Sequence, residues 1–222
     1  PSTFPAAPEY FFRMRGVNQA GPRLRDEIAP PPSLPPADFE QAMQAGALVV
    51  DTRAQAYFMS AHISGSLSNT FRDAFATWLG WLVIPDVPLL FVTGDERIED
   101  IVDEAMLVGY ERFSGVLEGG MAAWEASGRA VESAALVDGA EASRAVADGA
   151  FAIDVREDSE FGESHIPGAL HIPLGSLARR LEEIPRGRPL VTYCGHGERS
   201  ATALSILQRA GFDRVMNLDL GI

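Results

Sequence analysis

Short apolar runs alternate with stretches of helical periodicity along most of the chain. In the C-terminal half the apolar runs predict strands over residues 150–154, 170–171, 190–194 and 214–218. Helical stretches fall between these strands, and one of them covers residues 201–210. Strands that alternate with helices in this way are typical of a parallel sheet covered by helices on both faces. The pattern therefore predicts an α/β fold.

The longest apolar passage, residues 74–93, approaches the roughly 20 residues that a membrane-spanning helix needs. Two prolines and an aspartate interrupt it within residues 85–88. The pattern therefore predicts a helix over residues 71–82 and a buried strand over residues 89–93, and no membrane span.

The sequence repeats itself at an offset of about 102 residues, which suits a duplicated small domain and is too long for a solenoid repeat. The clearest pair is LVVDTR at 48–53, which returns as FAIDVR at 151–156. We therefore expect two domains of one fold, over residues 37–130 and 131–222.

The segment before these domains, residues 1–36, is irregular and rich in proline, as expected for an extended and stiff linker. Within it Tyr10, Met14 and Val17 fall at helical spacing. This spacing fits either a short helix docked on a neighbouring domain or the tail of a further domain upstream. Because the sequence begins without methionine, we expect it to be a fragment of a longer protein.

Composition narrows the functional classes. The chain has 222 residues, of which 46% are hydrophobic, and this suffices for a core in one large or two small domains. A formal net charge of −13 argues against nucleic acid or an anionic membrane surface as a partner. The single cysteine excludes an intrachain disulfide framework and suits a reducing compartment, so we expect a cytoplasmic protein.

That cysteine, Cys194, follows a predicted strand and opens a loop that contains Gly195 and Gly197, after which Arg199 and Ser200 begin a helical pattern. A thiol in this position faces the helix dipole and free backbone N–H groups, which stabilise a thiolate. We therefore predict that Cys194 is a nucleophile. The alternative is a cysteine that only fills the core, and the two glycines argue against it because they favour an exposed loop.

The second copy resembles the rhodanese family of sulfurtransferases through motifs in a fixed order: DVRE at 154–157, EF at 160–161, HIPGA at 165–169 with IP at 172–173, and CGHGERS at 194–200. The first copy resembles the same family through LEGGM at 117–121 and Trp124. The resemblance implies two rhodanese-like domains, each a short parallel sheet flanked by helices. It also implies that the first copy ends in a closing helix that the second copy, which stops at Ile222, lacks.

The first copy departs from the family at the loop. Thr93 takes the position of the cysteine, and the loop to Arg97 is one residue shorter. A threonine without an adjacent base is a poor nucleophile, and the carboxylates within residues 99–104 repel an anionic donor. We therefore predict a catalytically silent domain with a structural role. Trp78 and Trp81 are either its docking surface or ordinary core residues.

Loop length separates two enzyme classes on this fold. The resemblance associates a six-residue loop with sulfur transfer and a loop one residue longer with Cys-dependent phosphatases and arsenate reductases. Four residues lie between Cys194 and Arg199, so sulfur transfer is favoured and phosphatase activity is the weaker alternative. A third alternative is a non-catalytic scaffold for a removed enzyme domain.

The resemblance implies that the Cys194 thiolate takes a sulfane sulfur from thiosulfate or glutathione persulfide and passes it to a thiol, sulfite or cyanide. It gives Arg199 a catalytic role beside Cys194, with donor oxygens or a carboxylate held by its forked N–H groups. The expected substrate-binding residues are Gly195, His196, Gly197, Glu198, Arg199 and Ser200. We also expect Ser200 to cap the following helix, and Asp154, Arg156 and His165 to have structural roles.

The linker carries a second resemblance, through PEYFF at 8–12, Met14, VN at 17–18 and GP at 21–22. These residues look like the connector after the metallo-β-lactamase-fold domain in persulfide dioxygenases fused to tandem rhodanese domains. The resemblance implies such a domain as an upstream partner and a place in sulfide oxidation. The histidines of this chain are not at metal-ligand spacing, so we expect no metal and no cofactor.

Overall fold

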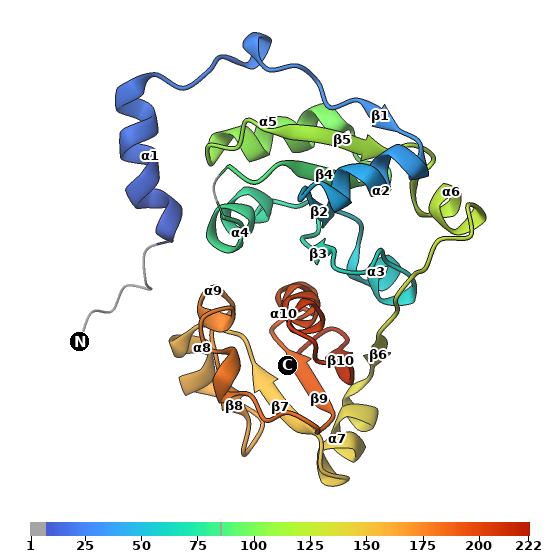
Figure 1. Ribbon diagram of the computed structural model, residues 1–222. Helices are drawn as coiled ribbons and strands as arrows, with labels where there is room; N and C mark the ends of the chain where they lie inside the picture. The colour runs from blue at the N-terminus through green and yellow to red at the C-terminus, as the bar shows by residue number, and fades with distance from the viewer. Residues whose placement is uncertain (1–7, 85) are drawn as a thin grey trace. The chain divides into compact units, whose positions relative to one another are not determined.

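The computed structural model describes residues 8–84 and 86–222, and Figure 1 shows that they form two sheets flanked by helices. Each sheet has five strands, in the order β1-β5-β4-β2-β3 in the first and β6-β10-β9-β7-β8 in the second. The strand pairs with a defined register are all parallel. This confirms the predicted α/β fold with two similar domains.

The first sheet contains β1 (Ser33–Leu34), β2 (Leu48–Asp51), β3 (Leu67–Ser68), β4 (Leu89–Val92) and β5 (Phe113–Leu117). The helices in this part of the sequence are α1 (Glu9–Ala20), α2 (Pro36–Gln44), α3 (Gln55–Ser60), α4 (Phe75–Leu82), α5 (Ile98–Leu107) and α6 (Gly120–Ala126), with a 3-10 turn η1 (Arg25–Glu27).

The second sheet contains β6 (Ala135–Val137), β7 (Phe151–Asp154), β8 (Leu170–His171), β9 (Leu190–Tyr193) and β10 (Val215–Leu218). Its helices are α7 (Gly139–Ala147), α8 (Asp158–Glu163), α9 (Leu174–Leu177) and α10 (Glu198–Arg209), with a 3-10 turn η2 (Leu181–Glu183).

The central strand of each sheet is buried along its whole length because both of its faces are covered. All four residues of β4 are buried, and so are all four of β9. The predicted strands over residues 89–93 and 190–194 are therefore confirmed, each ending one residue earlier than expected. Short edge strands such as β1 and β6 were not predicted, because two or three residues carry too little periodicity to read.

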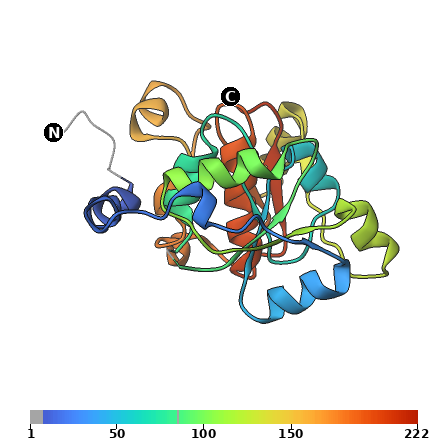
Figure 2. The ribbon, with the colours of Figure 1, turned by 90° about the horizontal axis from the view of Figure 1, so that it is seen from above.

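The linker helix α1 packs against helix α4 of the first domain, which agrees with the interpretation of a short docked helix. The ring of Tyr10 on α1 lies over Gly80 on α4, where an added Cβ would come within 2.6 Å of it, and Met14 lies beside Gly109. Figure 2 shows the long, mostly extended segment that runs on from α1 to α2, in keeping with the proline-rich sequence. On α4 the rings of Trp78 and Trp81 stack 5.4 Å apart, and both are half-buried.

The duplication is visible in matching side-chain contacts. Arg53 donates to both carboxylate oxygens of Asp51 in the first copy, and Arg156 donates to both oxygens of Asp154 in the second. Both aspartates are fully buried at the end of a strand. These ion pairs tie the strand end to the loop that follows, which confirms the structural role expected for Asp154 and Arg156.

No helix in the part of the chain that the structure describes is long and apolar enough to cross a membrane.

Candidate active site

Cys194 lies directly after β9, the central strand of the second sheet, between β10 and β7. This is the carboxyl end of a parallel strand, the edge at which open α/β sheets bind ligands. The side chain is only 1% exposed. The expectation that the two glycines would leave the thiol exposed is therefore wrong, because the loop folds back over the sulfur.

The loop reaches this conformation through Gly197. Its φ of 94° lies in the left-handed region that favours glycine, and it precedes the first residue of α10. Its N–H donates to Cys194 Sγ over 3.1 Å. The first N–H groups of any α-helix have no acceptor within the helix, so the start of α10 adds donors and positive dipole on the side of the loop. The sulfur thus lies in surroundings that favour negative charge.

Ser200 contacts the sulfur and does not cap the helix as expected. The capping position belongs to Gly197, because α10 begins at Glu198, earlier than the pattern indicated. Ser200 is fully buried in the first turn, 2.9 Å from the Gly197 carbonyl oxygen and 3.5 Å from Cys194 Sγ. Its hydroxyl can therefore donate to the sulfur.

Neighbouring residues hold the loop backbone from two sides. The amide of Asn217 on β10 donates to the Gly197 carbonyl over 3.2 Å. The backbone N–H of Ile222 donates to the Cys194 carbonyl over 3.0 Å, and Gly221 passes so close that an added Cβ would lie 2.0 Å from that oxygen. Sequence reasoning missed Asn217. The available signal was a polar amide within an otherwise apolar strand, and the structure shows that this amide is fully buried and therefore needs a hydrogen-bond partner.

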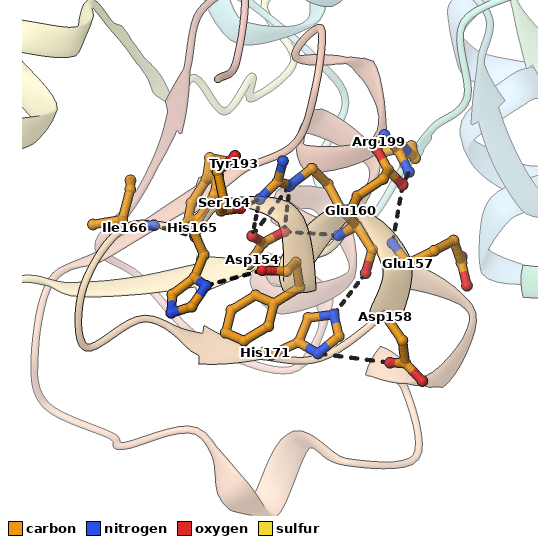
Figure 3. A network of polar contacts seen from close by, with 12 residues as sticks. Asp154, Glu157, Asp158, Glu160, Ser164, His165, Ile166, His171, Tyr193 and Arg199 are labelled. Atoms are coloured by element: carbon orange, nitrogen blue, oxygen red, sulfur yellow. Dashed lines mark hydrogen bonds and ion pairs between the residues drawn. The ribbon is translucent and has the colours of Figure 1, made fainter. Parts of the chain in front are cut away.

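Arg199 forms a forked ion pair with Glu160 of α8, which Figure 3 shows with the carboxylate facing the guanidinium. Nη1 lies 2.7 Å from Oε2 and Nη2 lies 2.6 Å from Oε1. The hydrogen bonds from Arg199 are the main reason that the pKa of Glu160 falls to about 2. The same bonds raise the pKa of Arg199, and the Cys194 sulfur adds to this effect because it lies near the guanidinium.

A polar network fixes α8 and the segment after it (Figure 3). Arg156, held by Asp154, also donates to the Ser164 carbonyl over 2.6 Å. The buried Tyr193 hydroxyl accepts from the Ile166 N–H over 3.2 Å, and burial is the main cause that raises the pKa of this tyrosine. These contacts hold the Glu160 helix against the sheet that carries Cys194.

Two of the predicted substrate-binding residues lie apart from the sulfur contacts. His196 is exposed at the tip of the loop, and Glu198 is half-buried at the first position of α10. Among the described residues no three His, Cys, Asp or Glu side chains group as metal ligands.

In the corresponding loop of the first domain, the Glu96 side chain accepts a backbone hydrogen bond of the same loop. Thr93 follows β4, and the N–H of Gly94 donates to Glu96 Oε2 over 2.6 Å. The carboxylate thus takes a backbone donor of the loop that would otherwise face an anion. This contact supports the prediction that the first domain is silent.

A family model described as "Rhodanese-like domain" matches the chain twice, over residues 35–127 and 138–222.

Among curated proteins, a "Sulfurtransferase" of Allochromatium vinosum is 40% identical over 70 residues, which are 32% of this chain and 65% of that protein. A thiosulfate sulfurtransferase of Pseudomonas syringae is 37% identical over 73 residues, 33% of this chain and 69% of the relative. A probable adenylyltransferase/sulfurtransferase of Mycobacterium tuberculosis is 38% identical over 118 residues, 52% of this chain and 29% of that protein. The matches to the Allochromatium and Mycobacterium proteins thus span less than two thirds of those proteins.

Among solved structures, a human single-domain sulfurtransferase is 26% identical, with a TM-score of 0.35, and the match covers 40% of this chain and 92% of that one. A thiosulfate sulfurtransferase of Pseudomonas aeruginosa is 19% identical, with a TM-score of 0.37, over 95% of this chain and 45% of that one.

Proposed function

The chain belongs to the rhodanese-like domain family, and from that membership we propose that it is a sulfurtransferase in which Cys194 carries the transferred sulfur. One observation carries the proposal. The only cysteine of the chain lies at the carboxyl end of a central parallel strand, where the Gly197 N–H donates to its sulfur over 3.1 Å. Donors placed in this way stabilise both a thiolate and the terminal sulfur of a persulfide.

In the first step the Cys194 thiolate attacks the outer, sulfane sulfur of a donor such as thiosulfate. A new S–S bond forms at Sγ while the S–S bond of the donor breaks, and its electron pair leaves with sulfite. The negative charge on the enzyme moves to the outer sulfur of the persulfide. The N–H groups at the start of α10 and the Ser200 hydroxyl can stabilise that charge by donating hydrogen bonds.

In the second step a nucleophilic acceptor such as cyanide, sulfite or a thiolate attacks the outer sulfur. The bond from the acceptor to this sulfur forms, and the electron pair of the Cys194 persulfide bond returns to Sγ as a thiolate. Neither step needs a metal, an oxidant or a proton carrier. The loop therefore contains the groups that the transfer requires.

The loop length supports sulfur transfer over phosphate ester hydrolysis. Four residues separate Cys194 from Arg199, and Cys194 is only 1% exposed, so the loop suits one sulfur atom better than a tetrahedral phosphate. The proposal extends to thiosulfate or a glutathione persulfide as donor. It also extends to a cytoplasmic role in sulfide metabolism beside an upstream metallo-β-lactamase-fold domain.

Mass spectrometry and a thiosulfate:cyanide assay test the proposal on the full chain. The wild type should gain the mass of one sulfur after treatment with donor and should form thiocyanate, and Cys194→Ser should do neither. Equal rates for the two proteins would overturn the proposal. Turnover of an aryl phosphate that depends on Cys194 would instead support the phosphatase alternative.

A further inference from the structure

The anion-binding fork of Arg199 is already occupied. Both of its terminal nitrogens donate to the Glu160 carboxylate, at 2.7 Å and 2.6 Å. Forked bonding to a carboxylate is among the strongest contacts that a guanidinium makes, and donor oxygens would need the same N–H groups. A donor that enters this site therefore meets an ion pair instead of a free cation.

The fold also fixes Glu160 independently of Arg199. Glu160 is the third residue of α8, and its Oε2 accepts the backbone N–H of Glu157 over 3.1 Å in a capping box. Figure 3 shows this carboxylate between the start of α8 and the Arg199 guanidinium. Because the helix end holds the carboxylate in place, the ion pair is part of the architecture of the site.

The ion pair lies beside Gly195, the residue after Cys194 in the loop. A Cβ added to Gly195 would lie 3.5 Å from Arg199 Nη2 and 3.9 Å from Glu160 Oε1. Gly195 directly follows Cys194, so the carboxylate lies beside the loop backbone next to the cysteine. At such a distance one unit of charge has a large effect on an anionic donor.

The neighbouring charged residues Arg156 and Glu157 do not supply a free positive charge for a donor. Arg156 donates to both oxygens of Asp154 and is buried. Glu157 is half-buried near Arg199, and burial is the main cause that raises its pKa. The positive charge of Arg199 is therefore balanced by the Glu160 carboxylate, and Glu157 places a second carboxyl group beside it.

We infer that Glu160 is a specificity-determining residue, which holds the Arg199 fork and thereby makes the site favour singly charged sulfane-sulfur donors over doubly charged ones. This inference rests on the proposed function. Persulfide anions and thiosulfonates belong to the favoured class, whereas thiosulfate, a dianion, belongs to the other. Glu160 acts on the donor through charge and through the position of Arg199.

Two donors that differ by one charge supply the test. Thiosulfate and methanethiosulfonate both present a terminal sulfane sulfur on a sulfonyl group, and methyl replaces one charged oxygen in the second. Their kcat/KM values are measured with cyanide as acceptor, for the wild type, Glu160→Gln and Glu160→Ala. The ratio of thiosulfate to methanethiosulfonate is compared between proteins, so the intrinsic reactivity of each donor cancels.

Both neutral variants should raise this ratio by about tenfold through a lower KM for thiosulfate, and added salt should shrink the difference. Glu163→Gln is the matched control, because it removes the same charge from an exposed position on the same helix. It should leave the ratio at the wild-type value. Thermal unfolding confirms that each variant is folded, and alanine serves as the second variant because it suits a helix interior.

A ratio that stays within twofold of the wild type in a folded Glu160→Gln or Glu160→Ala protein would overturn the inference. So would an equal loss of kcat with both donors, since that is the result of a purely structural role. If the wild type transfers sulfur from neither donor, the proposed function itself fails. The two failures are therefore distinct.

Discussion

The Ser200 hydroxyl oxygen lies 3.5 Å from Cys194 Sγ, across the first turn of α10. The same oxygen lies 2.9 Å from the Gly197 carbonyl, so a single hydroxyl hydrogen is shared between a carbonyl and a sulfur. When the sulfur is a thiolate, the hydrogen bond to the charged partner becomes the stronger of the two. Ser200 thus has a contact that responds to the charge state of Cys194.

Ser200→Ala should slow sulfur transfer by about three- to tenfold, because the thiolate and the persulfide each lose one donor. The measurement is kcat/KM with thiosulfate and cyanide, together with the rate at which iodoacetamide alkylates Cys194. Thr202→Ala is the control, because its hydroxyl donates to the Glu198 carbonyl of the preceding helical turn instead of to the sulfur. A similar loss in both variants would show that helix packing, and not the sulfur contact, is responsible.

Gly221 packs against the backbone of Cys194 and Gly195. Its φ of 67° and its approach to the Cys194 carbonyl leave no room for a Cβ. Gly221→Ala should displace this segment from the loop, weaken the bond from the Ile222 N–H and speed the alkylation of Cys194. Gly187→Ala is the matched control, since Gly187 has a similar φ of 79° but open space around its Cα. Both variants should lose about 1–2 kcal/mol of stability from backbone strain, and only the first should alter alkylation.

The Glu160 to Arg199 pair should make stability depend on pH in the acid range. The pKa of Glu160 is about 2 in the folded protein, against an ordinary value of 4.5. A depressed carboxyl pKa contributes stability that is fully present above about 4.5 and is lost as the pH falls towards about 2. The melting temperature of the wild type should therefore exceed that of Glu160→Gln at pH 6, and the gap should narrow as the pH falls towards about 2. A constant gap over this range would contradict the ion-pair origin, and Glu163→Gln should follow the wild type throughout.

The loop around Cys194 could be predicted from sequence because its residue types are unusual in local terms. An apolar strand, a cysteine, two glycines and a helical pattern follow one another within residues 190–210. The burial of Cys194 could not be predicted, since it depends on how the backbone after Gly195 turns over the sulfur. The expected cap at Ser200 failed for a related reason: Gly197, with its left-handed φ, begins the helix early.

Glu160 could not be assigned a role from sequence because its partner is far away along the chain. It was part of a motif by residue type, but the contact with Arg199 spans 39 residues and depends on packing of α8 against the sheet. The expectation that Arg199 is free to bind donor oxygens changes once this contact is known. Local patterns predict which groups are present, whereas tertiary packing decides which of them remain free.

The first domain should stay silent even when the missing nucleophile is restored. Thr93→Cys in a Cys194→Ser background should gain no sulfur after treatment with thiosulfate, because the loop to Arg97 is one residue shorter and Glu96 holds the Gly94 N–H. Intact-mass spectrometry measures the sulfur gain, and the wild type serves as the positive control. A stable gain of one sulfur at position 93 would mean that the threonine alone silences the domain. The predicted result instead assigns the silence to the loop as a whole, since a persulfide needs backbone donors that an internal carboxylate has not already taken.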